Sequence, residues 1–216
     1  MQNQTQVRST LSRLYNESKS DHFKMIKGLT KSLYRPVQPS DFKDVALAIS
    51  NEQGEFLINL IVENNFKKIV EFGTSFGIST LFLALGAKET GGNIVTSEIL
   101  EIKAKRALQN FQEAGVSEFI EVRIGDAMET LRDYSQPIDL LLLDGWKDLY
   151  LPLFRMLEPN LHSNSVVYVD NANMSETKIF LKEIATENKY DIHFQNNGKA
   201  ALIKAMSSGL TTTSSN

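Results

Sequence analysis

Short apolar runs with strand character, separated in most cases by helical patterns of roughly ten residues, constrain the fold of this chain most strongly. The first five strand-like runs are 68–72, 93–98, 120–124, 138–144 and 165–170. The helical patterns among and after them are 78–87, 101–114, 149–158 and 175–187. Such alternation is typical of βαβ units, so we expect an α/β fold with a mostly parallel sheet.

The two ends of the chain depart from this alternation of strands and helices. Two late strand-like runs, 190–195 and 200–205, flank a short turn and predict an antiparallel hairpin, which brings the sheet to seven strands. Residues 8–35 and 52–64 carry apolar positions at helical spacing. We expect an N-terminal helical segment over 1–50, one domain over 51–206 and a disordered tail over 207–216.

Composition excludes several classes of protein. The net charge of −3 offers no overall basic field for nucleic acid, and no apolar run approaches the length of a membrane span. The chain has no cysteine, so it has neither disulfides nor thiolate metal ligands. The opening stretch MQNQTQVRST is polar and lacks the apolar core of a signal peptide. We therefore expect a cytoplasmic protein that binds neither nucleic acid nor membrane.

Polar residues follow three of the strand-like runs directly. Glu71 lies at the end of the first run, just before Phe72, Asp144 ends the fourth run, and Asp170 ends the fifth with Asn171 directly after it. Ligands of open α/β sheets bind at the carboxyl ends of the strands, so these side chains are expected in one crevice. Two carboxylates, an amide and the nearby Lys147 indicate a site for a hard cation with a base beside it.

A glycine-containing loop follows the first run and reads EFGTSFGIST over 71–80. It lacks the dinucleotide fingerprint, because Ser75 stands in place of the middle glycine, and it lacks the Gly-Lys-Ser/Thr of a P-loop. The loop suits a nucleoside with an amino-acid tail, although a plain strand–helix turn remains open. Glu98 ends the second run and suits ribose hydroxyls, and Asp126 follows the third within reach of an adenine edge. Alternatively, Glu98 is solvated and Asp126 caps a helix.

The stretch LDGWKDLYLP over 143–152, together with the glycine loop and the Asp170–Asn171 pair, carries a family resemblance. Over residues 50–205 the chain resembles class I methyltransferases that use S-adenosylmethionine. Within them it is similar to the metal-dependent O-methyltransferases related to catechol O-methyltransferase and caffeoyl-CoA O-methyltransferase. The resemblance implies a Rossmann-like, doubly wound sheet, a small catechol- or phenol-type acceptor, and a homodimer.

The resemblance also assigns roles to residues. It implies Mg²⁺ or another divalent cation held by Asp144, Asp170 and Asn171. Lys147 would act as the base, with Asp144 as the second catalytic residue. The cation does much of the activation, because positive charge favours phenolate over phenol. The implied cofactor-binding residues are Glu71, Gly73, Thr74, Ser75, Gly77, Ser79, Glu98, Gly125, Asp126, Ala127, Asp144 and Trp146.

Different residues of the expected cofactor site are assigned to different portions of the cofactor. By the resemblance, Glu71, Gly73 and Ser79 hold the methionine portion. Trp146 lies beside the adenine or at the mouth of the acceptor pocket, or is simply a core aromatic. Asp144 could instead cap a helix, and Asp170–Asn171 could instead form an Asx turn. Each of these alternatives explains one position but not the occurrence of all three residues together.

The chain departs from the catechol enzyme at 196–199, where that enzyme's hairpin carries a glutamate and this chain has Asn-Asn-Gly-Lys. The acceptor is therefore not specified. The loop 35–39 is expected to close over the pocket, and Arg35 with Lys31 either favours an acidic substrate or is merely solvated. The alternatives are a metal-independent methyltransferase acting on nitrogen, a carboxylate or RNA, and a non-catalytic nucleoside- or partner-binding domain.

Overall fold

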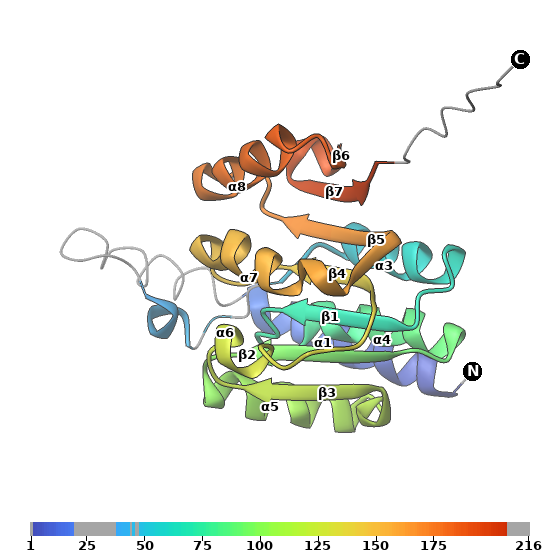
Figure 1. The fold of residues 1–216 in the computed structure, drawn as a ribbon. Helices are drawn as coiled ribbons and strands as arrows, with labels where there is room; N and C mark the ends of the chain where they lie inside the picture. Colours follow the sequence, from blue (N-terminus) through green and yellow to red (C-terminus); the bar gives the residue numbers. More distant parts are fainter. Residues whose placement is uncertain (1, 20–37, 44, 46–47, 207–216) are drawn as a thin grey trace, which may run out of the picture.

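Seven strands form one sheet in the order β3-β2-β1-β4-β5-β7-β6 (Figure 1). The protein is seen in a computed structural model that describes residues 2–19, 38–43, 45 and 48–206. The first five strands run parallel, whereas β7 is antiparallel to both β5 and β6. The predicted sheet with its closing hairpin is thus confirmed. The strands are β1 (Lys68–Phe72), β2 (Asn93–Glu98), β3 (Ile120–Ile124), β4 (Ile138–Leu143), β5 (Leu161–Asp170), β6 (Tyr190–Gln195) and β7 (Ala200–Ala205).

Helices cover both faces of the sheet, which makes it doubly wound. One face carries α1 (Gln2–Lys19), α3 (Asn51–Glu63), α4 (Ile78–Thr90) and α5 (Glu101–Glu113) (Figure 1). The other carries α6 (Ala127–Thr130), α7 (Tyr150–Leu157) and α8 (Ser175–Thr186). Short 3₁₀ turns are η2 (Pro39–Phe42), η3 (Ser117–Phe119), η4 (Lys147–Leu149), η5 (Glu158–Asn160) and η6 (Asn196–Gly198).

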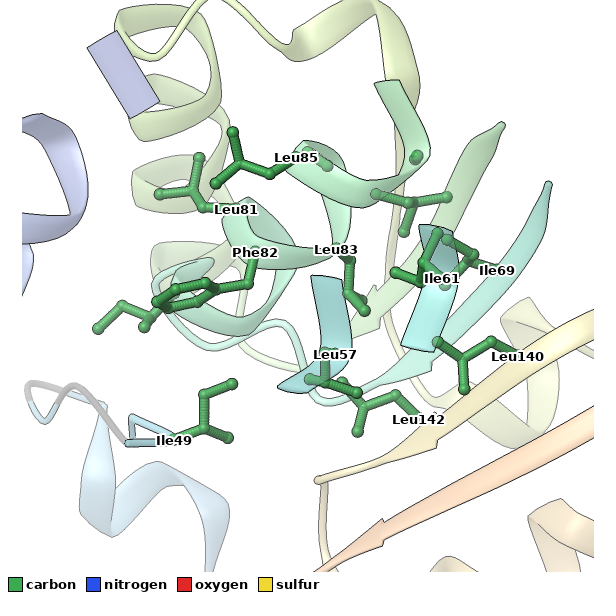
Figure 2. Packing of buried hydrophobic residues seen from close by; sticks show 14 of the residues in the cluster. Ile49, Leu57, Ile61, Ile69, Leu81, Phe82, Leu83, Leu85, Leu140 and Leu142 are labelled. Atoms are coloured by element: carbon green, nitrogen blue, oxygen red, sulfur yellow. The ribbon is translucent and has the colours of Figure 1, made fainter. Parts of the chain in front are cut away.

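The run of leucines in β4 explains how the two helical layers share one sheet. Successive side chains of a strand point to opposite faces. Leu140 and Leu142 accordingly lie in the core beneath α3 and α4, whereas Leu141 and Leu143 lie in the core beneath α7 and α8. Figure 2 shows Leu142 beside Leu57 of α3. A strand covered on both faces needs apolar residues at every position, and this is why its pattern is continuous.

Two boundaries differ from the sequence-based prediction. Helix α1 begins at Gln2, ahead of the first apolar repeat that marked residue 8. Strand β5 begins at Leu161, where Leu161 pairs with Ile138 before the register shifts. Residues 162–164 are exposed and carry no strand pattern, and the hydroxyl of Ser165 donates to the carbonyl of Ile138 at 2.6 Å beside this irregularity.

Several predictions lie outside the described residues. They concern the second half of the N-terminal helical pattern, the loop at 35–37 with Lys31, and the tail at 207–216. The division into segments at residues 50 and 206 stays a prediction. Within the part of the chain that the structure describes, no helix combines the length and the apolar character needed to cross a membrane.

Candidate cofactor and metal site

A cavity of about 460 Å³ opens at the carboxyl ends of the parallel strands. This volume lies in the range of small-molecule sites. Most of the predicted cofactor residues line it, namely Gly73, Ser75, Glu98, Gly125, Asp126, Ala127, Asp144 and Trp146. The crossovers of the sheet therefore bring together residues that are scattered over more than seventy positions of the sequence, as expected for strand ends at one edge of a sheet.

Apolar side chains complete the wall of the cavity, and the sequence analysis did not single them out. They are Phe42 of η2, Phe72 at the end of β1, Ile99 and Leu100 after β2, and Leu149 of η4. Trp146 is half-buried, lines the cavity and also packs against the core beneath α7. Its contact with the core is thus confirmed, and its place beside the adenine or at the mouth of the acceptor pocket stays a prediction. The cavity combines flat apolar surface with a few polar groups, which suits a planar ring with polar substituents.

The glycine loop passes close to the backbone at the end of β4. Gly73 has φ 106°, and a Cβ atom added to it would lie 2.6 Å from the carbonyl oxygen of Asp144. Only glycine fits this approach without moving backbone. The amides of Gly73 and Thr74 both donate to the carbonyl of Ser97, each at 3.1 Å, which ties the loop to β2.

Glu98 is held in place at the wall of the cavity. Its side-chain oxygens accept from the backbone amides of Ser75 at 2.8 Å and Leu100 at 2.9 Å. Each carboxylate oxygen has capacity for more than one hydrogen bond, so both can still accept from a ligand. Asp126 caps α6 by accepting from the amide of Met128 at 2.8 Å and also lines the cavity. The capping interpretation of Asp126 is therefore confirmed, and its role toward the adenine stays a prediction.

Four predicted cofactor residues do not line the cavity: Glu71, Thr74, Gly77 and Ser79. Glu71 is fully buried behind the loop and accepts from the hydroxyls of Ser79 at 2.5 Å and of Thr80 and Thr96 at 2.6 Å each. Burial raises the pKa of Glu71, and these hydroxyl donors oppose the rise. Its carboxylate is engaged by the protein itself, so the structure places it as a support for the loop.

Asp144 and Asp170 bring two carboxylates together at the ends of β4 and β5. Burial, and next the charge of Asp170, raise the pKa of Asp144 well above its ordinary value, while Lys147 opposes the rise. The Nζ atom of Lys147 lies 3.7 Å from Oδ1 of Asp144 and donates to the carbonyl of Gly145 at 2.9 Å. Asp144 caps neither η4 nor α7, which removes the capping interpretation.

This donor set fits a divalent cation. Asn171 follows Asp170 directly in the sequence with a left-handed φ of 55°, and its side chain carries an amide oxygen, a further donor of the kind that such a cation takes. Two buried like charges beside a single ammonium group are unfavourable, and a hard cation with oxygen ligands relieves that repulsion. Among the described residues, no group of three or more histidine, cysteine or acidic side chains gathers as a metal centre.

Gln53 is a residue of the site that the sequence analysis missed. Its Nε2 atom donates to Oδ1 of Asp170 at 2.7 Å and to the hydroxyl of Tyr168 at 3.1 Å. Its Oε1 atom accepts from the amide of Ser50 at 3.0 Å, within a capping box at the start of α3. The Ser-x-x-Gln spacing at 50–53 predicts that cap, but nothing in it points to Asp170.

The strand order and the antiparallel β7 are those of the α/β methyltransferase fold. Residues 8–200 match the O-methyltransferase family, and the chain belongs to this family. The resemblance noted in the sequence is thereby confirmed.

Individual relatives agree with this assignment. A catechol O-methyltransferase from Mycobacterium tuberculosis is 34% identical over 126 residues, which are 58% of this chain and 57% of that protein. The chain thus spans less than two thirds of that relative's length. An O-methyltransferase from Bacillus cereus in complex with SAH superposes with a TM-score of 0.66 at 23% identity, over 84% of this chain and 97% of that one. An SAH-bound Podospora anserina methyltransferase has a TM-score of 0.70 at 18% identity, over 92% and 96% of the two chains. These two structures share the fold.

Proposed function

We propose that this protein transfers a methyl group from S-adenosylmethionine to a hydroxyl of a small acceptor. The observation that carries the proposal is the pair of the partly buried Asp144 and the buried Asp170 beside Lys147, with Asp144 in the wall of a cavity that Glu98 also lines. Membership of the O-methyltransferase family supports it, and so do the fold neighbours bound to SAH, the cofactor without its methyl group.

The cofactor is proposed to lie along the cavity from β1 to β3. Its amino-acid end would approach the backbone at Gly73 and Ser75, where the loop has no bulky side chain. Its ribose hydroxyls would donate to Glu98, whose oxygens are already oriented by two backbone amides. Its adenine would lie against Ala127, Ile99 and Leu100, with Asp126 and Gly125 at the ring edge. Glu71, Thr74, Gly77 and Ser79 would act indirectly, by holding the loop from behind.

Asp144, Asp170 and Asn171 would hold Mg²⁺ or another divalent cation. When bound, that cation supplies positive charge that favours the deprotonated form of an acceptor hydroxyl. Gln53 would keep the carboxylate of Asp170 in its orientation, because its amide is itself fixed by Ser50.

Lys147 is proposed to receive the proton of the acceptor hydroxyl in its uncharged amine form, which the positive charge of a bound cation nearby would favour. Its Nζ atom is held between Oδ1 of Asp144 and the carbonyl of Gly145, two residues that line the cavity. The oxygen that loses its proton then forms a bond to the methyl carbon while the bond from that carbon to sulfur breaks. The products are a methyl ether, SAH and a proton on Lys147. The remaining contribution of the protein is to hold oxygen and methyl group in line.

The acceptor is proposed to be a phenol or catechol. Phe42, Trp146 and Leu149 give the cavity apolar walls suited to an aromatic ring. The turn η6 carries no carboxylate, so a second hydroxyl of a catechol would have to be recognised elsewhere. The expected homodimer and the cytoplasmic location stay predictions.

Methyl transfer from labelled S-adenosylmethionine to a panel of catechols and caffeoyl-type phenols, with Mg²⁺ and with EDTA, tests the proposal. Turnover that EDTA abolishes and Mg²⁺ restores is the expected result. Turnover that is insensitive to EDTA would instead identify a metal-independent methyltransferase. Binding of SAH without turnover on any phenol, amine, carboxylate or RNA in the panel would contradict the enzymatic proposal.

A further inference from the structure

The N-terminal helix α1 is connected to the glycine loop through one buried amide, that of Asn110 in α5. The side chain of Asn110 donates from Nδ2 to the carbonyl of Phe76 at 2.8 Å. Its Oδ1 atom accepts from Nη2 of Arg13 at 2.8 Å. Asn110 is 3% exposed, and it thus joins two elements that lie far from each other in the sequence.

Arg13 determines which way this amide points. A guanidinium group only donates hydrogen bonds, so the atom of Asn110 that faces Arg13 must be the oxygen. The NH₂ group is then directed at Phe76 and its carbonyl. Arg13 is itself fixed by ion pairs with Glu17 and Glu113, both at 2.8 Å. The orientation of the amide is therefore set from α1 and the end of α5.

The loop segment that Asn110 contacts includes a residue in an unfavourable backbone conformation. Ser75 has φ 50°, a left-handed conformation that residues other than glycine seldom adopt and that persists only where the surroundings impose it. Its amide is held by Glu98, and the next carbonyl, that of Phe76, is held by Asn110. Arg106 lies over the ring of Phe76 at 4.8 Å from its centroid. Helix α5 thus holds this stretch of the loop through Asn110 and Arg106.

We propose that Asn110 is a positioning residue for the cofactor and that Arg13 makes helix α1 part of the support of the cofactor site. The proposal rests on the proposed function, because it takes the cavity at Gly73 and Ser75 to be the place of the cofactor. Asn110 touches no ligand in this scheme. It acts by holding the Phe76–Gly77 peptide through the Phe76 carbonyl, and so keeps Ser75, the residue before Phe76, in the conformation that the cofactor meets.

The test uses two substitutions of Asn110 that differ in one hydrogen bond. Asn110→Asp keeps an acceptor for Arg13 and almost the same volume but loses the donor to Phe76. Asn110→Ser is shorter and reaches neither partner. We expect both variants to bind SAH at least tenfold more weakly in calorimetry, and Asn110→Asp to raise the KM for S-adenosylmethionine with little change in kcat.

A matched pair on α1 separates this role from simple stabilisation. Arg13→Ala removes the orienting guanidinium, whereas Arg8→Ala removes the ion pair of the same helix with Glu55 of α3, which does not reach the loop. Both arginines are partly exposed, so both variants are expected to fold. Arg13→Ala should weaken SAH binding about tenfold, whereas Arg8→Ala should leave SAH binding unchanged. We expect this difference even if the two substitutions lower the unfolding midpoint of the protein by the same amount.

The outcomes are distinguishable from a failure of the proposed function. A wild-type protein that does not bind SAH would refute the proposed cofactor, whatever the variants do. A wild-type protein that binds SAH, with Arg13→Ala and Asn110→Asp binding it equally well, would overturn the positioning role. Equal weakening by Arg8→Ala and Arg13→Ala would also overturn it, since α1 would then act only through overall stability.

Discussion

The Nε2 atom of Gln53 donates to Oδ1 of Asp170 at 2.7 Å and so joins the first turn of α3 to the last residue of β5. The amide cannot rotate freely, because its Oε1 atom accepts from Ser50 in the capping box. One lone pair of the Asp170 carboxylate is therefore oriented by a helix that contributes no ligand of its own to the proposed metal site.

Replacing Gln53 by leucine is expected to weaken divalent-cation binding. Residues that orient a metal ligand typically contribute about 10–100-fold to metal affinity. The loss should appear in calorimetric titration with Mn²⁺, and a stability loss of about 1.5–3 kcal/mol should accompany it, since a buried carboxylate loses a donor. Gln109→Leu, on the exposed face of α5, is the control and should change neither quantity. Unchanged Mn²⁺ affinity in Gln53→Leu would remove Gln53 from the site.

The stabilising effect of Mg²⁺ is expected to grow with pH because of Asp144. Its pKa is raised in the folded protein, so without a cation the folded state holds a proton that the unfolded chain has released. Stability therefore falls as pH rises from 3.8 through the raised pKa, by up to about 1.4 kcal/mol per pH unit for one proton. A cation binds the deprotonated pair and cancels this loss.

Thermal unfolding with and without Mg²⁺, followed from pH 5 to pH 8, measures this effect. The shift in Tm on adding Mg²⁺ should be larger at the higher pH. In Asp144→Asn, the Tm measured without Mg²⁺ should vary less with pH, and the increase in Tm on adding Mg²⁺ should vanish. A Tm shift that is the same at every pH, or one that survives in Asp144→Asn, would argue against a cation at this pair.

Substitution of Lys147 is expected to reduce kcat without changing cofactor affinity. Transfer of a proton to a positioned side chain contributes about 10²–10⁴-fold to rate. Lys147→Met should show a loss of that size, and Lys147→Arg should not restore activity, because a guanidinium keeps its charge but does not accept the proton. Restoration by arginine would mean that Lys147 acts only through its charge. Lys105→Met, at an exposed lysine of α5, is the control.

Alanine substitutions at two glycines with left-handed φ distinguish the cost of backbone strain from the cost of steric overlap. At Gly91, φ is 68° and an added Cβ meets nothing within 4 Å, so Gly91→Ala should cost only about 1–2 kcal/mol in urea unfolding. At Gly73, an added Cβ meets the backbone of Asp144 and Gly145 at 2.6–2.8 Å. Gly73→Ala should therefore cost clearly more and also abolish SAH binding. Equal costs at the two positions would contradict the tight approach of the loop to β4.

Most of the sheet and part of the site could be predicted from the sequence. The continuous apolar runs of β1 and β4 and the helical spacing between strands are local patterns, and each is set by contacts along one element. A polar residue at the end of such a run is also visible locally, so Asp144 and Glu98 could be assigned to the cavity wall and Asp170 to the strand end beside Asp144. The burial of Glu71 behind the loop could not be predicted in this way, because its three hydroxyl partners come from α4 and β2.

The sequence by itself determined the order of strands and helices and which carboxylates reach the end of the sheet, since both follow from periodicity and connectivity. Only the tertiary structure decided which side chains hold those groups in place. Gln53 binds Asp170, which lies 117 positions away in the sequence. Asn110 binds both Arg13, 97 positions away, and Phe76, 34 positions away. Such pairings depend on how helices pack on the sheet and against one another, and that packing follows from the shape and volume of many side chains together and leaves no repeat in the sequence.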